Sequence, residues 1–188
     1  LTVLEIKATA NGSGSTFAVT TPIGHYIAKL GERLDFLSVY RKACPILEEA
    51  GLKQSHIAYS DKKLALYEWL NGETYKTMTP ERVENAILYM KRYFEVLKKI
   101  PLDTIKIKRI NTWDDAKSLS FLLDEFPKTD YYQAFPCVIA AIKHLSKARE
   151  MLVNFPKQLI HSDLGADNFL FIDNKVNAII DFTPEIAP

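Results

Sequence analysis

Short apolar runs separated by turn residues dominate the first seventy positions and predict a β-rich region over residues 1–70. Residues 16–21 are β-branched and aromatic, a composition that favours strands. A turn containing proline and glycine leads from there into a second apolar run at 25–30. A further strand is predicted over 63–70, where an Asn-Gly pair stops the apolar pattern.

One helix is predicted within this β-rich region, over residues 35–50. Gly51 indicates its end, because glycine is favoured at the position just after a helix. Pro45 lies inside the pattern and lacks an amide hydrogen, so we expect it to end the helix or to kink its first half.

Beyond the last of these strands the apolar spacing becomes helical. Thr79 followed by Pro80 is typical of a helix start, with a capping residue before proline at the first helical position. A helix is therefore predicted over 80–100, and two more over 113–124 and 131–153. Apolar residues recur at helical spacing along the first of them, at Val83, Ile87, Met90, Phe94 and Leu97.

The end of the chain returns to short strands, predicted over 158–160, 168–172 and 177–180, with a polar turn between the last two. The whole pattern predicts an α+β fold with two lobes. We expect a small β-rich lobe over 1–70, a hinge near its end, and a helical lobe over 71–188.

Composition narrows the classes of partner. The 188 residues carry a formal net charge of +1, which argues against nucleic acid or an anionic membrane as partner. No signal peptide and no apolar run of membrane-spanning length is visible. Two isolated cysteines, Cys44 and Cys137, are typical of reduced thiols in a cytoplasmic protein.

The loop from His161 to Asn168 carries the most informative residues. It reads His-Ser-Asp-Leu-Gly-Ala-Asp-Asn, and Asp181 follows Asn168 by thirteen positions at the end of an apolar run. His-x-Asp-Leu-x-x-x-Asn followed by Asp-Phe is the pattern of the catalytic loop and metal site in phosphoryl transfer. Asp163 is therefore the candidate base, and Asn168 and Asp181 offer the hard oxygen ligands that Mg²⁺ prefers.

Each of these residues also has a structural interpretation. Asp163 could be a helix cap or a turn residue, and the same holds for Asn168 and Asp181. Three such residues at this spacing favour one shared cause. His161 is predicted to be a packed histidine that hydrogen-bonds the loop, and Asp167 a solvated turn residue.

Two features of the β-rich region fit a nucleotide. Lys29 ends an apolar run; alone it could be an edge lysine that reaches solvent, but beside the downstream loop it is the candidate cation for the α/β-phosphates. Gly12 and Gly14 begin a glycine-rich turn that matches Gly-x-Gly-x-x-Gly-x-Val, except for Phe17 in the third glycine position. Such a turn could cover phosphates, and a flexible hairpin explains it equally well.

The segment 67–72 would form the hinge, where backbone groups around Glu68 and Leu70 could meet the edge of a nucleotide base. A strand end followed by a β-turn is an equally good interpretation of this segment.

Together these residues resemble the aminoglycoside phosphotransferase and choline kinase-like family of small-molecule kinases. The resemblance implies a two-lobed, protein-kinase-like fold, ATP or GTP as donor with Mg²⁺, and a small-molecule hydroxyl as acceptor. It implies that Asp163 is the catalytic Asp, that Asn168 and Asp181 bind the metal, and that Lys29 binds phosphate. Ser162, where protein kinases have Arg, favours the small-molecule branch.

The chain departs from the family at the partner of its strand lysine. The family pairs that lysine with a Glu on the following helix, but the corresponding position falls near Arg41 and Lys42, where the charge is wrong. Glu48 or Glu49 could substitute if the helix is shifted.

The second departure is the end of the chain, seven residues after Asp181. The family continues with helices that complete its C-lobe, so we expect a truncated C-lobe here, without the residues that choose among an aminoglycoside, an amino alcohol, a sugar and homoserine. Two other functions stay open at this stage: a nucleotide-binding, non-catalytic (pseudokinase-like) regulatory module, and a plain interaction domain.

Overall fold

The computed structural model describes residues 2–9, 15–107, 125–129, 137, 139–141, 143–144, 147 and 154–187. Gly12 and Gly14 of the glycine-rich turn lie outside these residues, as does the helix predicted over 113–124. The helix predicted over 131–153 lies largely outside them.

The chain divides into two compact units. One comprises Leu1–Ile107 with Leu159–Pro184, and the other comprises Lys108–Gln158 with Glu185–Pro188. All of the contacts described below lie within the first unit. The lobe boundary near residue 70 stays a prediction.

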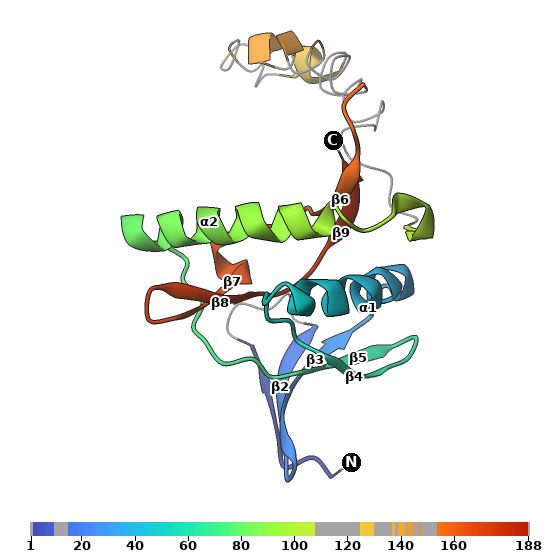
Figure 1. Cartoon of the computed structure of the whole chain (residues 1–188), viewed down its shortest axis with the longest axis vertical. Coiled ribbons are helices and arrows are strands. Elements are labelled where there is room, and N and C mark those ends of the chain that lie inside the picture. The colour runs from blue at the N-terminus through green and yellow to red at the C-terminus, as the bar shows by residue number, and fades with distance from the viewer. Residues whose placement is uncertain are drawn as a thin grey trace. The chain divides into compact units, whose positions relative to one another are not determined.

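A five-stranded antiparallel sheet begins the first unit, with strand order β1-β2-β3-β5-β4 (Figure 1). Its strands are β1 (Glu5–Ala8), β2 (Thr16–Thr21), β3 (Gly24–Leu30), β4 (Ile57–Ser60) and β5 (Leu64–Glu68). The three predicted strands correspond to β2, β3 and β5. Lys29 lies in the central strand β3, opposite Thr16 on one side and Ala65 on the other.

Helix α1 (Leu34–Glu49) follows the sheet's third strand and runs through Pro45 without ending there. Of the two outcomes predicted for Pro45, an end or a kink, the end does not occur. Proline removes one helical hydrogen bond, but Ala43, Cys44 and Leu47 on either side of it are buried. Burial of this apolar face stabilises the helix more than one lost bond weakens it.

The predicted end of α1 at Gly51 is confirmed. Gly51 has φ +72°, its amide donates to the carbonyl of Glu48 at 2.7 Å, and the amide of Leu52 donates to Leu47 at 2.9 Å. Leu47 and Leu52 are both fully buried. This is the Schellman arrangement, in which a left-handed residue closes the helix and an apolar contact spans the turn.

Replacing Gly51 with Ala is expected to lower the free energy of unfolding by about 1–2 kcal/mol, because a side chain is strained at this positive φ. Its Cβ would also lie 3.3 Å from a guanidinium nitrogen of Arg92. Urea denaturation measures the change. Gly51→Asn is the matched control and should cost less, since Asn tolerates the left-handed conformation; equal losses in both variants would contradict the explanation.

Helix α2 (Pro80–Leu97) begins as predicted, with the Thr79 side chain accepting a hydrogen bond from the amide of Arg82 at 3.3 Å. Its buried face is formed by Ala86, Tyr93, Val96 and Leu97, and α2 contacts α1 and β8.

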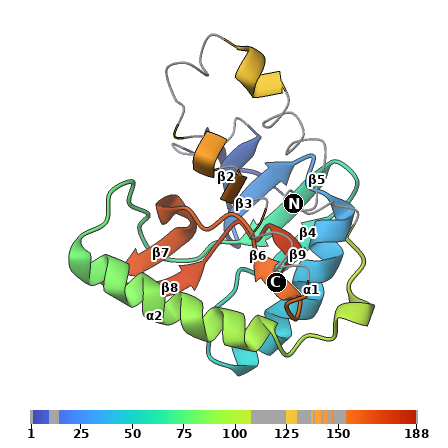
Figure 2. The same ribbon diagram turned by 90° about the horizontal axis from the view of Figure 1, so that it is seen from above.

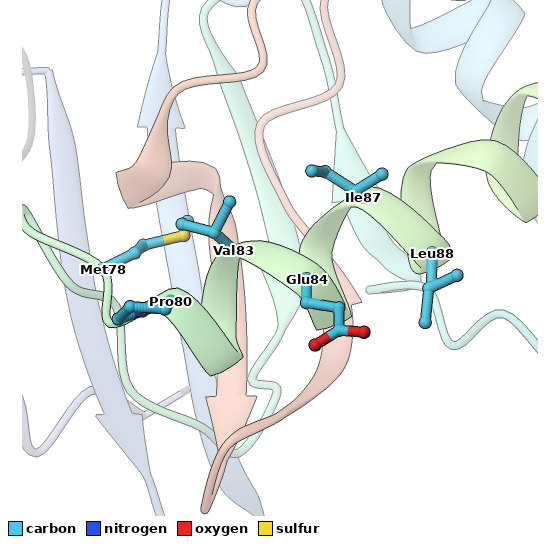
Figure 3. Close-up of a pocket in the computed structure, with 6 residues that line it drawn as sticks. All are labelled: Met78, Pro80, Val83, Glu84, Ile87 and Leu88. Carbon is cyan, nitrogen blue, oxygen red and sulfur yellow. The ribbon is translucent and has the colours of Figure 1, made fainter.

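Two of the apolar residues that indicated α2, Val83 and Ile87, are exposed instead. They line an open pocket of about 440 Å³ with Met78, Pro80, Glu84 and Leu88 (Figure 3). No predicted site residue lines this pocket.

The last strands are β6 (Gln158–His161), β7 (Phe169–Ile172), β8 (Lys175–Ile179) and β9 (Pro184–Ala187). Strands β7 and β8 form an antiparallel hairpin beside α2 (Figure 2). Its turn contains Asp173 at φ 55°, so the turn predicted between the last two strands is confirmed.

The linker after β5 is tied to this hairpin. Glu73 and Phe171 exchange two backbone hydrogen bonds of 2.9 Å, and the Asn177 side chain donates to the carbonyl of Asn71 at 2.8 Å. These bonds hold the end of the sheet beside the hairpin that carries the candidate metal residues. Among the described residues, no helix has both the length and the apolar character to cross a membrane.

Candidate active site

His161 ends β6 and links the loop that follows it to the segment just before Asp181. Its Nδ1 accepts a hydrogen bond from the amide of Asp163 at 3.2 Å, and its Nε2 lies 3.1 Å from the carbonyl of Ile180. An amide can only donate and a carbonyl can only accept, so the ring must be the tautomer protonated at Nε2. Burial lowers the pKa of His161, which agrees with this neutral form. The predicted role as a packed, hydrogen-bonding histidine is confirmed.

Asp163 is held by its backbone, with its carboxylate left available. Its amide donates to His161, and its carbonyl accepts from the Asn168 side chain at 2.7 Å. Within the described part of the chain, no hydrogen bond to the Asp163 carboxylate is formed. A fixed backbone with a free, exposed carboxylate suits a group that must accept a proton from a bound molecule.

The hairpin brings Asn168 and Asp181 to one end of its two strands. Asn168 precedes β7 and Asp181 follows β8, and Phe169 pairs with Ile179. The amide of Ile180 donates to the carbonyl of Asn168 at 2.9 Å, which continues the pairing beyond the strands. A separation of thirteen residues in the chain therefore becomes proximity in the fold.

Lys29 reaches this end of the hairpin from the sheet. Its Nζ lies 2.5 Å from Oδ1 of Asp181 and 3.9 Å from Oε2 of Glu32. The Lys29 side chain is 17% exposed, so the pair is well shielded on the lysine side. It also lies 5.5 Å from the ring centroid of Tyr67.

Neither carboxylate near Lys29, that of Asp181 or that of Glu32, belongs to helix α1. Glu48, one of the two residues considered as its partner, instead pairs with His56 at 2.9 Å. Sequence reasoning missed Glu32, which precedes α1 and stands three residues after Lys29. That i,i+3 spacing of opposite charges was the available signal, but the chain leaves the strand between them and only the structure shows that they approach.

Burial raises the pKa of Glu32, and the charge of Lys29 opposes that rise. The hydroxyl of Tyr67 lies 3.5 Å from Oε2 of Glu32, a long contact that contributes less. Glu32 thus places a second carboxyl group near Lys29, at a longer distance than that of Asp181.

Phe182, directly after Asp181, anchors this corner in the core. Its ring lies 5.4 Å from the ring of His161, 5.9 Å from Tyr40 on α1 and 6.5 Å from Tyr93 on α2. Asp181 itself has φ 59°, a left-handed conformation that is uncommon outside glycine and asparagine-like residues. The apolar anchor beside it holds the carboxylate in this unusual backbone position.

The predicted hinge residues differ in their backbone bonding. Both backbone groups of Glu68 are occupied: its amide donates to His56 at 2.8 Å and its carbonyl accepts from the Ser55 hydroxyl. The backbone of Leu70 makes no hydrogen bond to other described residues. Leu70 therefore keeps the free groups that a nucleotide base would need.

Replacing His161 with Phe is expected to lower the free energy of unfolding by about 1–3 kcal/mol, because it leaves the Asp163 amide and Ile180 carbonyl unpaired. Since burial lowers the His161 pKa, the folded state resists the proton that the unfolded state accepts. Wild-type stability should therefore fall as the pH drops below about 6.5, and the variant should lack this component.

Urea denaturation between pH 5 and pH 8 tests both statements. His25→Phe is the control, because His25 is exposed, and a surface change of this kind usually stays within about 0.5 kcal/mol. An unchanged pH profile in His161→Phe would contradict the assignment of a buried neutral histidine.

Comparison with known families gives one match along almost the whole chain. The family model described as "Phosphotransferase enzyme family" matches residues 5–184. No curated protein matches the chain.

Several solved structures have the same fold. A GDP complex of a mutant aminoglycoside 2'-phosphotransferase-IIIa superposes with a TM-score of 0.75 at 15% identity, covering 100% of this chain and 68% of that one. The GDP and kanamycin complex of APH(2")-IIia has a TM-score of 0.71 at 16% identity, covering 97% and 68%. The streptomycin–ATP ternary complex of APH(2")-IIa has a TM-score of 0.55 at 16% identity, covering 98% and 68%. At these identities the likeness shows the fold, and it confirms the predicted protein-kinase-like class.

Proposed function

This chain belongs to the phosphotransferase enzyme family, and we propose that it transfers the γ-phosphate of a magnesium-bound nucleoside triphosphate to a hydroxyl group of a small molecule. The observation that carries the proposal is the meeting of Lys29 and Asp181. These residues are 152 positions apart in the chain, yet their side chains lie 2.5 Å from one another. This contact supports the proposal that Lys29 binds phosphate beside a metal ligand, Asp181.

The residues present fit Mg²⁺ by the chemistry of their free atoms. Asn168 uses its side-chain nitrogen to bind the carbonyl of Asp163, so its side-chain oxygen remains as a ligand. Asp181 uses Oδ1 to bind Lys29, which leaves Oδ2. Both are hard oxygen donors, which Mg²⁺ prefers. When bound, the ion would neutralise charge on the phosphates.

Lys29 would bind the non-transferred phosphates from the sheet side. Its contact with Asp181 holds the ammonium group at the place where those phosphates would lie, so little side-chain ordering is needed on binding. Glu32, whose Oε2 lies 3.9 Å from the Lys29 Nζ, would help to orient Lys29.

Asp163 would orient the acceptor hydroxyl and take its proton. Phosphoryl transfer requires mainly positioning and charge stabilisation, and the Asp163 backbone is fixed by His161 and Asn168. The Asp163 carboxylate would therefore start from a fixed backbone position when it meets the acceptor.

The donor would be ATP or GTP, so turnover is measured with both nucleotides. Two of the similar structures are GDP complexes and one contains ATP, which supports a purine nucleotide. The base would lie against the hinge at Leu70 rather than at Glu68, whose backbone groups are already bonded, and Gly12 and Gly14 would cover the phosphates.

The acceptor is proposed as a hydroxyl-bearing small molecule, and phosphorus NMR with Mg-ATP or Mg-GTP identifies its class. The four candidate classes are an aminoglycoside, an amino alcohol, a sugar and homoserine. We expect a phosphomonoester resonance with at least one of them, absent when Asp163 is replaced. Nucleotide binding without any phosphomonoester would favour the non-catalytic regulatory module, and no binding at all the interaction domain.

A further inference from the structure

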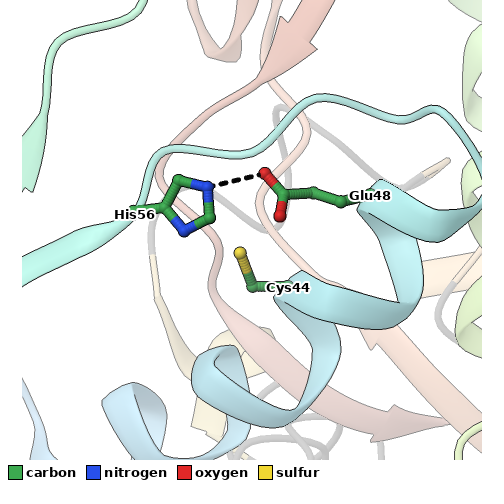
Figure 4. Close-up of side chains that lie close together, drawn as sticks. All are labelled: Cys44, Glu48 and His56. Atoms are coloured by element: carbon green, nitrogen blue, oxygen red, sulfur yellow. Dashed lines mark ion pairs between the residues drawn. The ribbon is translucent and has the colours of Figure 1, made fainter.

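A second group of potential ligands lies on α1, apart from the residues assigned to phosphoryl transfer. Cys44 and Glu48 are four residues apart, so they share one face of the helix. His56 lies on the segment that follows the helix, and its side chain is next to those of Cys44 and Glu48 (Figure 4). Their ligand atoms all lie within 4.8 Å of one another, and His56 Nε2 is 2.9 Å from Glu48 Oε1.

Two hydrogen bonds that do not involve the side chains of Cys44, Glu48 or His56 hold the segment around His56 in place. The Tyr40 hydroxyl, one turn before Cys44, donates to the carbonyl of Ser55 at 2.6 Å. The next carbonyl, that of His56, accepts from the amide of Glu68 at 2.8 Å. The returning segment is thus bound to α1 on one side and to β5 on the other, which holds His56 in place.

We infer that Cys44, Glu48 and His56 bind a divalent transition-metal ion, with zinc as the best match. A thiolate, an imidazole and a carboxylate are all zinc ligands, whereas magnesium takes oxygen ligands almost exclusively. Three protein ligands at these separations leave a fourth position for water, as in open zinc sites. This site is separate in residues and in ligand chemistry from the one formed by Asn168 and Asp181.

Exposure agrees with this assignment. Cys44 is buried, whereas the side chains of Glu48 and His56 are 32% and 55% exposed, so an ion can enter from the histidine side. Burial, followed by the neighbouring charge of Glu48, raises the pKa of the Cys44 thiol to about 11. This rise is a cost that the metal–sulfur bond must offset, because the thiol proton is released to solvent as that bond forms.

Cobalt(II) titration of the full chain, free of any histidine tag, tests the proposal. Cobalt replaces zinc in such sites and absorbs visibly, with a thiolate-to-metal charge-transfer band when sulfur is a ligand. We expect that band to saturate at one cobalt per chain and to disappear when zinc is added. His56→Ala should weaken cobalt binding by at least about 10-fold, and Cys44→Ser should remove the band.

Cys137→Ser is the matched control, because Cys137 is the other cysteine and is exposed; it should behave as the wild type. His56 is exposed enough that His56→Ala should fold even if Cys44→Ser does not. The proposal is overturned if folded wild-type protein shows no charge-transfer band, if His56→Ala binds cobalt as tightly as the wild type, or if Cys137→Ser loses the band. Mg-nucleotide binding is measured separately. A negative cobalt result would therefore overturn the proposed metal site without affecting the proposed phosphotransferase function.

Discussion

Replacing Asp163 with Asn is expected to lower the rate of phosphoryl transfer by about 10²–10⁴-fold, the usual contribution of a general base. Asn keeps the size of the side chain but cannot take a proton from a hydroxyl group. Asp163 bonds to the rest of the loop through its backbone amide and carbonyl, so the substitution leaves the loop in place. Binding of the magnesium nucleotide should therefore change little.

The measurement is release of inorganic phosphate or formation of phosphomonoester, followed beside calorimetric nucleotide binding. Asp167→Asn is the matched control, since Asp167 is exposed on the same loop and its carboxylate bonds to none of the candidate residues that the structure describes. Wild-type turnover in Asp163→Asn, or an equal loss in Asp167→Asn, would contradict the role given to Asp163.

Replacing Asp181 with Asn is expected to raise the Mg²⁺ concentration needed for nucleotide binding by at least about 10–100-fold, and to reduce turnover with it. Changes to groups that merely orient metal ligands already cost this much, and Asp181 is assigned as a ligand itself. The substitution also removes the 2.5 Å ion pair with Lys29. The ammonium group then loses the partner that positions it for the phosphates.

Asp173→Asn provides the control for backbone effects. Asp173 belongs to the same hairpin and has φ 55°, close to the 59° of Asp181, and Asn is tolerated in that conformation. Magnesium titration of nucleotide binding should give the wild-type midpoint in Asp173→Asn. A wild-type midpoint in Asp181→Asn as well would remove Asp181 from the metal site.

The main elements were predictable from the chain because their signals are local. Thr79 and Pro80 mark the start of α2, and Gly51 marks the end of α1, since capping depends on adjacent residues. The chemistry of Asp163, Asn168 and Asp181 could be proposed from spacing because one loop and one hairpin connect them.

The remaining features depend on contacts between distant segments, which a single sequence does not show. Pro45 continues α1 because the residues around it are buried, and the extent of that burial depends on the packing of the whole unit. The approach of Glu32 to Lys29 depends on the path of the chain between β3 and α1. The cluster of Cys44 with His56 forms only after the chain reverses at Gly51.

Calorimetric titration of the wild-type chain with Mg-ATP and Mg-GTP analogues that cannot be hydrolysed tests the central claim most directly. The site formed by Lys29, Asn168 and Asp181 predicts one nucleotide bound per chain, with affinity that falls sharply when EDTA removes magnesium. Absence of binding to either nucleotide, or binding that is indifferent to magnesium, would contradict the claim that these residues hold a magnesium-bound nucleoside triphosphate.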